Sequence, residues 1–419
     1  MKRIIDKLSV LAAHPVARGS IIVFLGSIFG NFAAYIYHLI VGRMLGPSGY
    51  GELAALFSLF YLLNVPSGVL QTVLIKYLSG FRVKSEFGKA RSVSVGAVRR
   101  LVLLGIAGAI LLVPFVGKLS EFLHIENPTS LFFIYLTSVI GLLTIVQVSL
   151  LQAFQKFPQS VIVANIIAAL RVGGGIVGAF FGVVETVFAG LVTSIVGFIA
   201  YIFPLRFIYT SSPKPANISK KEMTSYAVPS LVTILGMTSL YSTDILLAKH
   251  YLLPTEAGFY AALSVLGKII FFASSNISYV LFPVIAERTS QKTHSHKLVY
   301  GALLGVFVLS VCVTLGYFLF PRFVLLLLFG ASYYPAAPYL GWFGVFLTLY
   351  SLCQLLVTTL LGRGDMKVWL FVGLAAISQI VTITWMHNGI AALISVNISI
   401  MLSLFLSLLL YYRHAIKAH

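Results

Sequence analysis

Three ionisable side chains lie deep inside long apolar stretches of this sequence, namely Arg171, Asp244 and Lys268. A charge at such a place costs about 3 kcal/mol or more unless it is paired or hydrated. Two cations against one anion leave an excess of positive charge, which suits an anionic ligand such as a phosphate or a pyrophosphate. We therefore predict that Arg171 and Lys268 bind an anionic group. Structural ion pairing is the alternative that the sequence leaves open.

Asp244 is the only acidic residue well inside an apolar stretch, with Tyr241 one helical turn before it and Lys268 in the next stretch. Two roles compete for its carboxylate. One is a fixed salt bridge with Lys268, whose loss would strand a charge in a dry site. The other is a carboxylate that binds H⁺ or Na⁺ when Lys268 turns to an anionic ligand. We favour the second role, which makes Asp244 a candidate for ion coupling.

Polar residues recur at helical spacing along several of these apolar stretches. They include Asn31, Tyr35 and His38 in the first stretch, Gln71 in the second and Tyr241 in the seventh. In lipid, a polar helix face must turn toward protein or water. These residues are therefore candidates for lining a central cavity, and ordinary hydrogen bonds between helices are the alternative.

A further basic group lies at the ends of the first and seventh stretches and consists of Arg43, Lys249 and His250. Snorkelling of the side chains to the membrane interface explains this group as well as ligand binding does. The two cysteines, Cys312 and Cys353, lie inside apolar stretches, where a thiol usually acts as a small apolar group. They predict neither a disulfide nor a metal site, and we expect no cofactor.

Composition defines the elements that must position these residues. Hydrophobic residues make up 59% of the 419-residue chain, charged residues make up 10%, and the mean hydropathy is +0.99, far outside the range of soluble domains. A stretch of about 20 apolar residues crosses the hydrocarbon core as a helix. Twelve such stretches can be placed, at roughly 20–42, 53–78, 96–118, 130–154, 158–182, 184–208, 225–249, 258–283, 298–320, 335–361, 367–387 and 389–411. The predicted fold is an all-α integral membrane protein with twelve transmembrane helices.

One motif occurs twice, as IVGRMLGPSGYGELAALFSL at 40–59 and as LAKHYLLPTEAGFYAALSVL at 247–266. An offset of 254 − 47 = 207 sets Pro47 on Pro254 and also aligns Gly51 with Gly258. Each copy joins the end of one apolar stretch to the start of the next. The chain therefore consists of two related halves, as in many secondary transporters.

Six stretches per half is an even number, so both halves enter the membrane in the same direction and the repeat is parallel. We predict two six-helix bundles around a central cavity. The N-terminal lobe would span 1–209 and the C-terminal lobe 225–419, and the polar segment 210–224 would link them on the cytoplasmic side.

Lysine and arginine residues gather on one side of the predicted spans. They precede the first span, follow the second and eighth spans and occupy the linker, whereas the opposite side holds only Arg43, Lys118, Lys249 and Arg322. The positive-inside rule then places both termini in the cytoplasm. The net charge of +18 serves mostly to anchor the protein to anionic lipid, so we expect membrane lipids as partners and no nucleic acid.

The segment GRMLGPSGYGELAALFSLFYLL, which follows a polar first helix beginning near RGSIIVFLGSIFGN, resembles the N-terminal signature of the polysaccharide transporter family. That family belongs to the superfamily that also holds multidrug exporters and the lipid II flippase. The resemblance implies alternation between inward-open and outward-open states and a cargo of oligosaccharide on a polyprenyl pyrophosphate carrier. Lipid II flippases normally show adjacent Arg and Asp where this chain has Tyr37 and His38, and they carry two further spans.

The predicted function is therefore that of a flippase in the cell membrane, which moves a polyprenyl-pyrophosphate-linked oligosaccharide to the outer leaflet with H⁺ or Na⁺ as a possible coupling ion. It is a transporter and not an enzyme. One alternative is a cation-coupled multidrug exporter. The other is a polysaccharide polymerase or ligase, which would ordinarily show a large outer loop, whereas the longest here is about a dozen residues around Lys118–Thr129.

Overall fold

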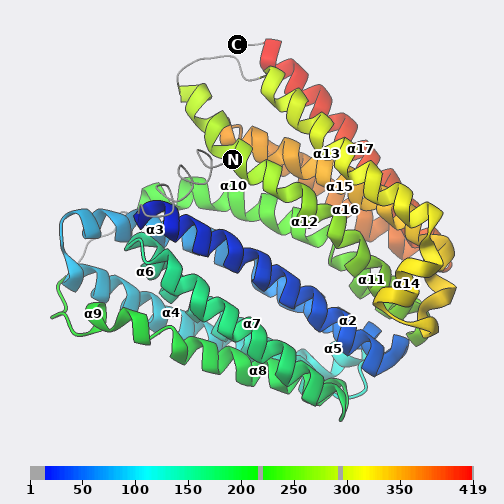
Figure 1. The fold of residues 1–419 in the computed structure, drawn as a ribbon, viewed down its shortest axis with the longest axis horizontal. Coiled ribbons are helices and arrows are strands. Elements are labelled where there is room, and N and C mark those ends of the chain that lie inside the picture. The colour runs from blue at the N-terminus through cyan, green and yellow to red at the C-terminus, as the bar shows by residue number, and fades with distance from the viewer. Residues whose placement is uncertain (1–14, 216–219, 291–295, 418–419) are drawn as a thin grey trace, which may run out of the picture. The chain divides into compact units, whose positions relative to one another are not determined.

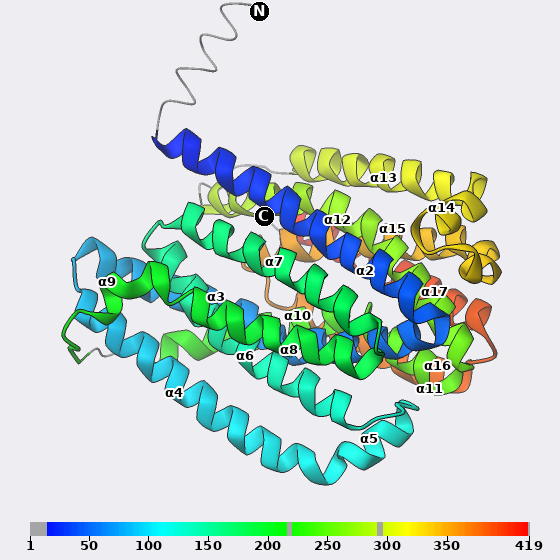
Figure 2. The same ribbon diagram turned by 60° about the horizontal axis from the view of Figure 1, so that its bottom comes forward.

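The computed structural model describes residues 15–215, 220–290 and 296–417, and within these ranges every regular element is a helix (Figures 1 and 2). The elements in chain order, with η marking short 3₁₀ helices, are α2 (Pro15–Leu63), α3 (Val65–Val83), α4 (Phe87–Leu112), η1 (Val113–Phe115), α5 (Val116–Phe122), α6 (Thr129–Ala153), α7 (Phe157–Ala179), α8 (Val183–Ala200), η2 (Phe203–Leu205), α9 (Arg206–Tyr209), α10 (Lys220–Ser239), α11 (Thr243–Tyr251), α12 (Pro254–Ser290), α13 (His296–Leu319), α14 (Pro321–Leu328), η3 (Ala331–Ala336), α15 (Ala337–Gly362), α16 (Val368–Trp385) and α17 (Ile390–Lys417). The predicted all-α class is confirmed.

Eleven helical segments among the described residues are long and apolar enough to cross a membrane. The first of them, Gly26–Val83, has 58 residues, and a straight helix of that length would measure about 87 Å. This is nearly three times the thickness of the hydrocarbon core. This segment overlaps the first and second predicted spans, and each of the other segments overlaps one. All twelve predicted spans therefore coincide largely with helices, as expected for a multi-pass membrane protein.

A backbone turn at Gly46 separates the first two spans inside α2. Gly46 has φ 65° and ψ 179°. This φ lies in the left-handed region that favours glycine, and an extended ψ suits the residue before a proline. Pro47 then starts the next helix, where its missing N–H costs no hydrogen bond. In the second copy of the motif α11 ends at Tyr251, Leu252 is extended and α12 starts at Pro254. The repeated motif is therefore a joint between two helices.

The described helices group into two compact units. The first comprises Met1–Met44, Pro66–Ser120 and Asn127–Met223, and the second comprises Leu45–Val65, Glu121–Glu126 and Thr224–His419. The joint after Met44 and the turn after Ser120 thus pack with the C-terminal helices. These units are defined by which residues contact one another, whereas the predicted lobes 1–209 and 225–419 are defined by the internal repeat. The lobe boundaries stay a prediction.

In the first unit, α6 packs against α4 and α8, and α8 runs along α7 (Figures 1 and 2). Its buried core gathers apolar side chains of α3, α4, α6, η2 and α9, such as Leu78, Leu150 and Ile208. The first residues of the predicted linker are fixed to α4, because Arg91 Nη1 donates a 2.6 Å hydrogen bond to the Ser211 carbonyl oxygen. Residues 216–219 of the linker lie outside the described ranges.

In the second unit, α15 is the central helix, and α12, α13 and α17 pack against it. Its aromatic residues Phe343, Phe346 and Tyr350 are buried, and Phe343 contacts both Phe346 and Tyr260 of α12 edge-on, each with 5.3 Å between ring centroids. On another side of the unit, α16 packs against α11 and α17. Three of these helices, α11, α16 and α17, carry polar side chains in mostly apolar sequences. The packing turns those side chains toward one another and not toward lipid.

Candidate functional site

A chain of hydrogen-bonded polar side chains runs through the second unit, and we call it the Asp244 network. Tyr260 Oη donates to Asp244 Oδ2 over 2.7 Å, and the Ile245 backbone N–H donates to Oδ1 over 2.9 Å. Asn397 Nδ2 donates to Tyr260 Oη over 2.7 Å, and Gln379 Nε2 donates to Asn397 Oδ1 over 2.7 Å. The four side chains belong to α11, α12, α16 and α17, and each is 0% exposed.

The network explains how a carboxylate is accommodated at zero exposure. Asp244 lies in the first turn of α11, where the helix dipole favours negative charge, and a buried charge needs hydrogen bonds. Within the described part of the chain, no carboxylate oxygen lies within 4.0 Å of Lys268 Nζ. Asp244 and Lys268 attract each other only over a longer distance. The fixed salt bridge considered from the sequence is therefore not formed in this structure.

Lys268 of α12 lies instead among aromatic rings. Its Nζ atom is 5.1 Å from the ring centroid of Tyr241 and 5.3 Å from that of Tyr61. Tyr241 in turn packs edge-on against Tyr350, with 5.5 Å between centroids, and stacks on Phe271 at 6.3 Å. A cation over aromatic faces is stabilised by the ring quadrupoles. This contact is not a hydrogen bond, so the three N–H donors of the ammonium group can still bind a ligand. Two of the predicted site residues, Lys268 and Tyr241, are therefore neighbours.

Arg171 of α7 has a related environment in the first unit. Its guanidinium carbon lies 5.3 Å from the ring centroid of Tyr37, a residue of α2 that is only 3% exposed. Gly175, one turn after Arg171, makes the approach of α7 to α2 possible, because a Cβ atom there would overlap the Tyr37 ring. The Tyr37 ring also contacts His38 edge-on at 5.5 Å. The predicted site residues Arg171 and His38 thus both contact the ring of one tyrosine.

The other predicted cavity residues differ in exposure and contacts. Asn31 is exposed, whereas Tyr35 and His38 are partly buried. Gln71 of α3 donates through Nε2 to Gln152 Oε1 of α6 over 3.1 Å. That bond is the kind of interhelical contact that the sequence left open as the alternative to a cavity role.

The three basic residues at the span ends also differ from one another in exposure and contacts. Arg43 is exposed, but Lys249 is only 4% exposed and is attracted by the carboxylate of Glu52. The Glu52 carboxylate itself accepts a hydrogen bond from the backbone of Glu126. His250 stacks on Phe122 with 3.9 Å between ring centroids. Arg43 and His250 occupy equivalent positions of the repeat (250 − 207 = 43).

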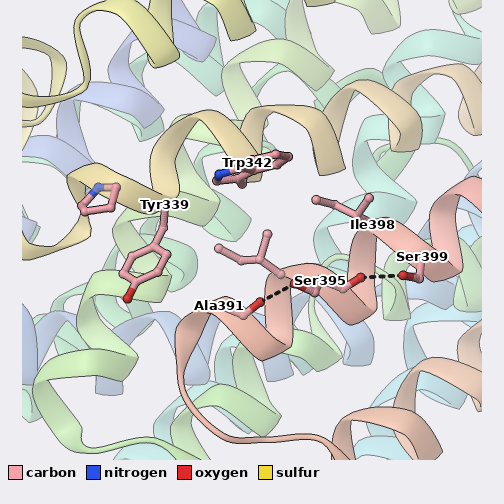
Figure 3. Close-up of a pocket in the computed structure, with 8 residues that line it drawn as sticks. Tyr339, Trp342, Ala391, Ser395, Ile398 and Ser399 are labelled. Carbon is pink, nitrogen blue, oxygen red and sulfur yellow. Dashed lines mark hydrogen bonds between the residues drawn. The ribbon is translucent and has the colours of Figure 1, made fainter.

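Two of the cavities in the second unit are similar in size but differ in the side chains that line them. A groove of about 420 Å³ between α15 and α17 is bordered by Tyr339, Trp342 and Ile398 (Figure 3). Its Ser395 and Ser399 hydroxyls donate to carbonyl oxygens one turn back in α17, both over 2.8 Å, so their donors are already used. The second cavity, of about 430 Å³, is lined by ionisable side chains at the end of α11.

The sequence analysis missed Tyr260, Gln379 and Asn397, three of the four members of the Asp244 network. A signal for two of them exists, because an amide side chain in the middle of an apolar helix needs a polar partner just as a carboxylate does. Gln379 in LAAISQIVTITW and Asn397 in ALISVNISIML meet that criterion.

The fold and these sites define a multi-pass helical membrane protein, and its fold is similar to that of solved transporters of the MOP superfamily. An inward-facing multidrug resistance MATE family transporter of that superfamily has a TM-score of 0.69 and 16% identity and covers 91% of this chain and 94% of its own. The lipid II flippase MurJ in an inward closed conformation has a TM-score of 0.76 and 14% identity, with 94% and 87% covered. A MOP superfamily transporter from Pyrococcus furiosus has a TM-score of 0.59 and 15% identity, with 96% of each chain covered.

Residues 40–338 match the family model described as polysaccharide biosynthesis protein. Because this match covers most of the chain, the protein belongs to that family, and the resemblance found in the sequence is confirmed. No curated protein matches the sequence.

Proposed function

We propose that the protein is a flippase, which moves an oligosaccharide linked to a polyprenyl pyrophosphate from the cytoplasmic to the outer leaflet of the cell membrane by alternating access. The observation that carries the proposal is Lys268. Its ammonium lies inside a helix able to cross the membrane, over two aromatic rings and outside ion-pair distance of the described carboxylates. Such a cation suits a phosphate, and family membership supports a polysaccharide precursor as cargo.

In this proposal the phosphates and sugars enter a polar cavity and meet Arg171 and Lys268, while the polyprenyl chain stays in lipid. Dehydrating sugars in hydrocarbon would be prohibitive, because each unpaired hydroxyl costs several kcal/mol there. The groove beside Trp342 (Figure 3), in which the Ser395 and Ser399 hydroxyls already donate within α17, offers the chain a surface bordered by apolar side chains such as Ile394 and Ile398. The protein would break no bond of its cargo, and the linker 210–224 and both termini would face the cytoplasm.

The cargo proposal is tested in cells that depend on this protein for surface polysaccharide. Arg171→Ala and Lys268→Ala should each reduce the polysaccharide, and Arg171→Lys should keep part of it because the charge survives although the bidentate fork does not. Lys84→Ala, which removes one exposed charge between α3 and α4, is the matched control and should transport normally. Full transport by a correctly inserted Arg171→Ala, Lys268→Ala double variant would remove both residues from the site.

Topology is tested separately by reporter fusions. A reporter placed within 210–222 or after Tyr412 should read cytoplasmic, and one placed near Glu126 should read external. Termini on opposite sides of the membrane would contradict the parallel repeat.

Coupling is tested in reconstituted vesicles. Asp244→Asn should remain folded and bind cargo but ignore an imposed H⁺ or Na⁺ gradient, because an amide cannot exchange a proton or hold a cation as a carboxylate does. Misfolding that is rescued by Lys268→Met would instead indicate a structural pair.

The buried carboxylate of Asp244 also favours a second candidate, a cation-coupled multidrug exporter, since exporters need an ion site and the MATE fold is similar. Efflux of small organic cations that depends on Asp244 but not on Arg171 or Lys268 would favour this candidate. Neighbouring genes for glycosyltransferases would favour the flippase.

A further inference from the structure

Three histidines from separate segments line the second cavity of the C-terminal unit, which we call the histidine cavity. His250 ends α11, His387 lies between α16 and α17, and His124 precedes α6. The cavity has a volume of about 430 Å³, and Lys249 and Glu256 also line it. The proposed cargo contacts, Arg171 and Lys268, do not include any of these residues.

Ring stacking fixes two of the imidazoles. His250 stacks on Phe122, with 3.9 Å between centroids and 16° between planes, and His387 stacks on Tyr251, with 4.0 Å and 18°. His250 and Tyr251 also contact each other at 4.5 Å. These ring contacts leave each imidazole little freedom to rotate. The two imidazoles are therefore held in defined orientations at the cavity.

The hydrogen bonds of these rings decide which nitrogen remains for a ligand. His250 Nδ1 lies 2.6 Å from the carbonyl oxygen of Phe122, and His387 Nδ1 lies 3.0 Å from that of Thr384. A carbonyl oxygen only accepts, so Nδ1 carries the proton in both rings. In the neutral ring Nε2 is then an acceptor, and it becomes a donor only when the imidazole is protonated. A ligand that accepts hydrogen bonds from both Nε2 atoms must therefore bind together with protons.

The third histidine, His124, has a strained backbone conformation. His124 has φ 48°, a left-handed conformation that costs a non-glycine residue energy and that gathers at functional sites. In this conformation its ring lies 5.7 Å from that of His250 and nearly parallel to it. The strained turn thus keeps a further imidazole beside the first.

The charged groups around the cavity make it amphoteric. Lys249 supplies an ammonium group, and the carboxylates of Glu52 and Glu126 attract it. The Leu253 backbone N–H donates a 3.4 Å hydrogen bond to Glu256 Oε2, which caps the start of α12. His124, His250, His387 and Tyr251 complete the titratable groups that face the cavity. With its imidazoles protonated, the cavity carries a positive excess.

From this geometry we propose that the histidine cavity binds a phosphate or diphosphate group, with His250 and His387 taking up protons as Nε2–H donors and Lys249 adding a third cationic contact. A metal ion fits less well, since no group of three or more possible ligands with suitable geometry occurs in the described residues. If the flippase proposal and its topology hold, this end of α11 faces outward and the cavity meets the cargo diphosphate after translocation. The binding itself does not depend on that role.

The test measures binding of inorganic pyrophosphate to the full chain in nanodiscs of zwitterionic lipid, by calorimetry in two buffers of different ionisation enthalpy. We expect binding at about pH 6 with net proton uptake, and affinity at least about tenfold weaker at about pH 8. His250→Gln and His387→Gln should each weaken binding about tenfold, because each removes one charge-assisted hydrogen bond. A glutamine amide can still donate to the carbonyl that holds Nδ1, so the fold should survive, as thermal unfolding would verify.

His414→Gln is the matched control, because it removes an exposed histidine near the end of α17 and should not change binding. A second arm replaces pyrophosphate by a short prenyl diphosphate; equal affinity would indicate a lipid-linked ligand and preference for pyrophosphate a free anion. Absence of binding, equal binding at both pH values without proton uptake, or binding unaffected by both histidine variants would overturn the proposal. If the wild-type protein binds pyrophosphate as expected and the histidine variants still export polysaccharide normally, the binding site is supported and only its role in cargo release is contradicted.

Discussion

Residues 37 and 244 occupy the same place in the two copies of the repeat (244 − 207 = 37), yet their chemistry is opposite. Tyr37 is buried and lies against the guanidinium of Arg171 on α7. Asp244 is buried and accepts a hydrogen bond from Tyr260, in a network that reaches Gln379 on α16. One half thus holds a cation on an aromatic ring, and the other holds an anion on hydroxyl and amide groups.

The partners of these two positions are related as well. Position 171 falls on 378 by the same offset (171 + 207 = 378), one residue before Gln379. Tyr37 therefore contacts a polar residue of the fifth helix of its own half directly, and Asp244 is linked to one through Tyr260 and Asn397. The duplicated fold preserves where a buried polar contact lies but not its charge, because helix packing depends on side-chain size and spacing whereas the sign of a charge depends only on its partners. In the proposed flippase, opposite charges in equivalent places would serve an anionic cargo group and a coupling cation.

The largest effect should come from positions where the two copies agree. A Cβ atom on Gly258 would overlap the backbone carbonyl of Pro47, and overpacking against backbone costs about 3 kcal/mol. We expect Gly258→Ala to lower the thermal unfolding temperature strongly. Gly301→Ala, where a Cβ atom meets open space in α13, is the control and should be neutral or slightly stabilising. Equal stability of both variants would show that the close contact is not essential.

Tyr260→Phe should have the next largest effect, because it removes the hydroxyl that donates to Asp244 and accepts from Asn397. Leaving a buried carboxylate short of one hydrogen bond costs about 2 kcal/mol. Tyr339→Phe, in the groove of Figure 3, should change stability little. In a double-mutant cycle, Asp244→Asn should reduce the cost of Tyr260→Phe. Strict additivity in denaturant unfolding would contradict the coupling.

Arg171→Met should cost less, about 1 kcal/mol, because it removes the cation from the Tyr37 ring while an unbranched apolar side chain still covers that ring. Arg171→Lys keeps a cation and should retain part of the stability. A loss for Arg171→Met as large as that for Tyr260→Phe would erase the predicted difference between the two halves. Unfolding of purified protein in detergent provides the measurement.

The smallest effect is expected at Glu86, between α3 and α4, where the carboxylate accepts a 2.8 Å hydrogen bond from Lys89 Nζ. This bond lowers the pKa of Glu86 below its ordinary value of 4.5. A lowered pKa in the folded state stabilises the protein above the ordinary pKa, and the contribution disappears as the pH falls through the folded value. Glu86→Gln should therefore be slightly less stable than wild type at neutral pH and equal to it in acid. A difference that persists in acid would assign the effect to packing.

Much of the fold could be predicted from the sequence because membrane helices are long, apolar and bounded by distinct signals. The Gly46-Pro47 pair marks a helix joint through backbone conformation alone, and Pro254 marks its counterpart. The site could be predicted only in part. Asp244 and Lys268 stand out because charges are rare in such helices, but their separation in the structure follows from the side on which each helix packs.

Contacts between distant segments were the part that spacing could not reveal. Tyr260 looks like an ordinary apolar-helix tyrosine until Asn397, 137 residues away, is known to lie beside it. Gln71 likewise has the same pattern whether it faces water or, as here, Gln152. Such pairs depend on the angle and depth at which helices cross, and one sequence does not define either.

The close approach of Gly51 and Gly258 has a consequence for the history of the chain. A Cβ atom on Gly51 would lie 2.8 Å from the backbone nitrogen of Gly258, and these two residues are each other's counterparts in the repeat (51 + 207 = 258). Contact between a residue and its own counterpart is the mark of an isologous interface, the kind that a homodimer forms on its twofold axis. A half-length ancestor pairing with a second copy of itself would place one glycine from each subunit on that axis. Fusion of the two genes would allow positions such as 37 and 244 to diverge. Gly51 and Gly258 would still constrain each other, because a side chain on either would collide with the backbone of the other or of a residue near it.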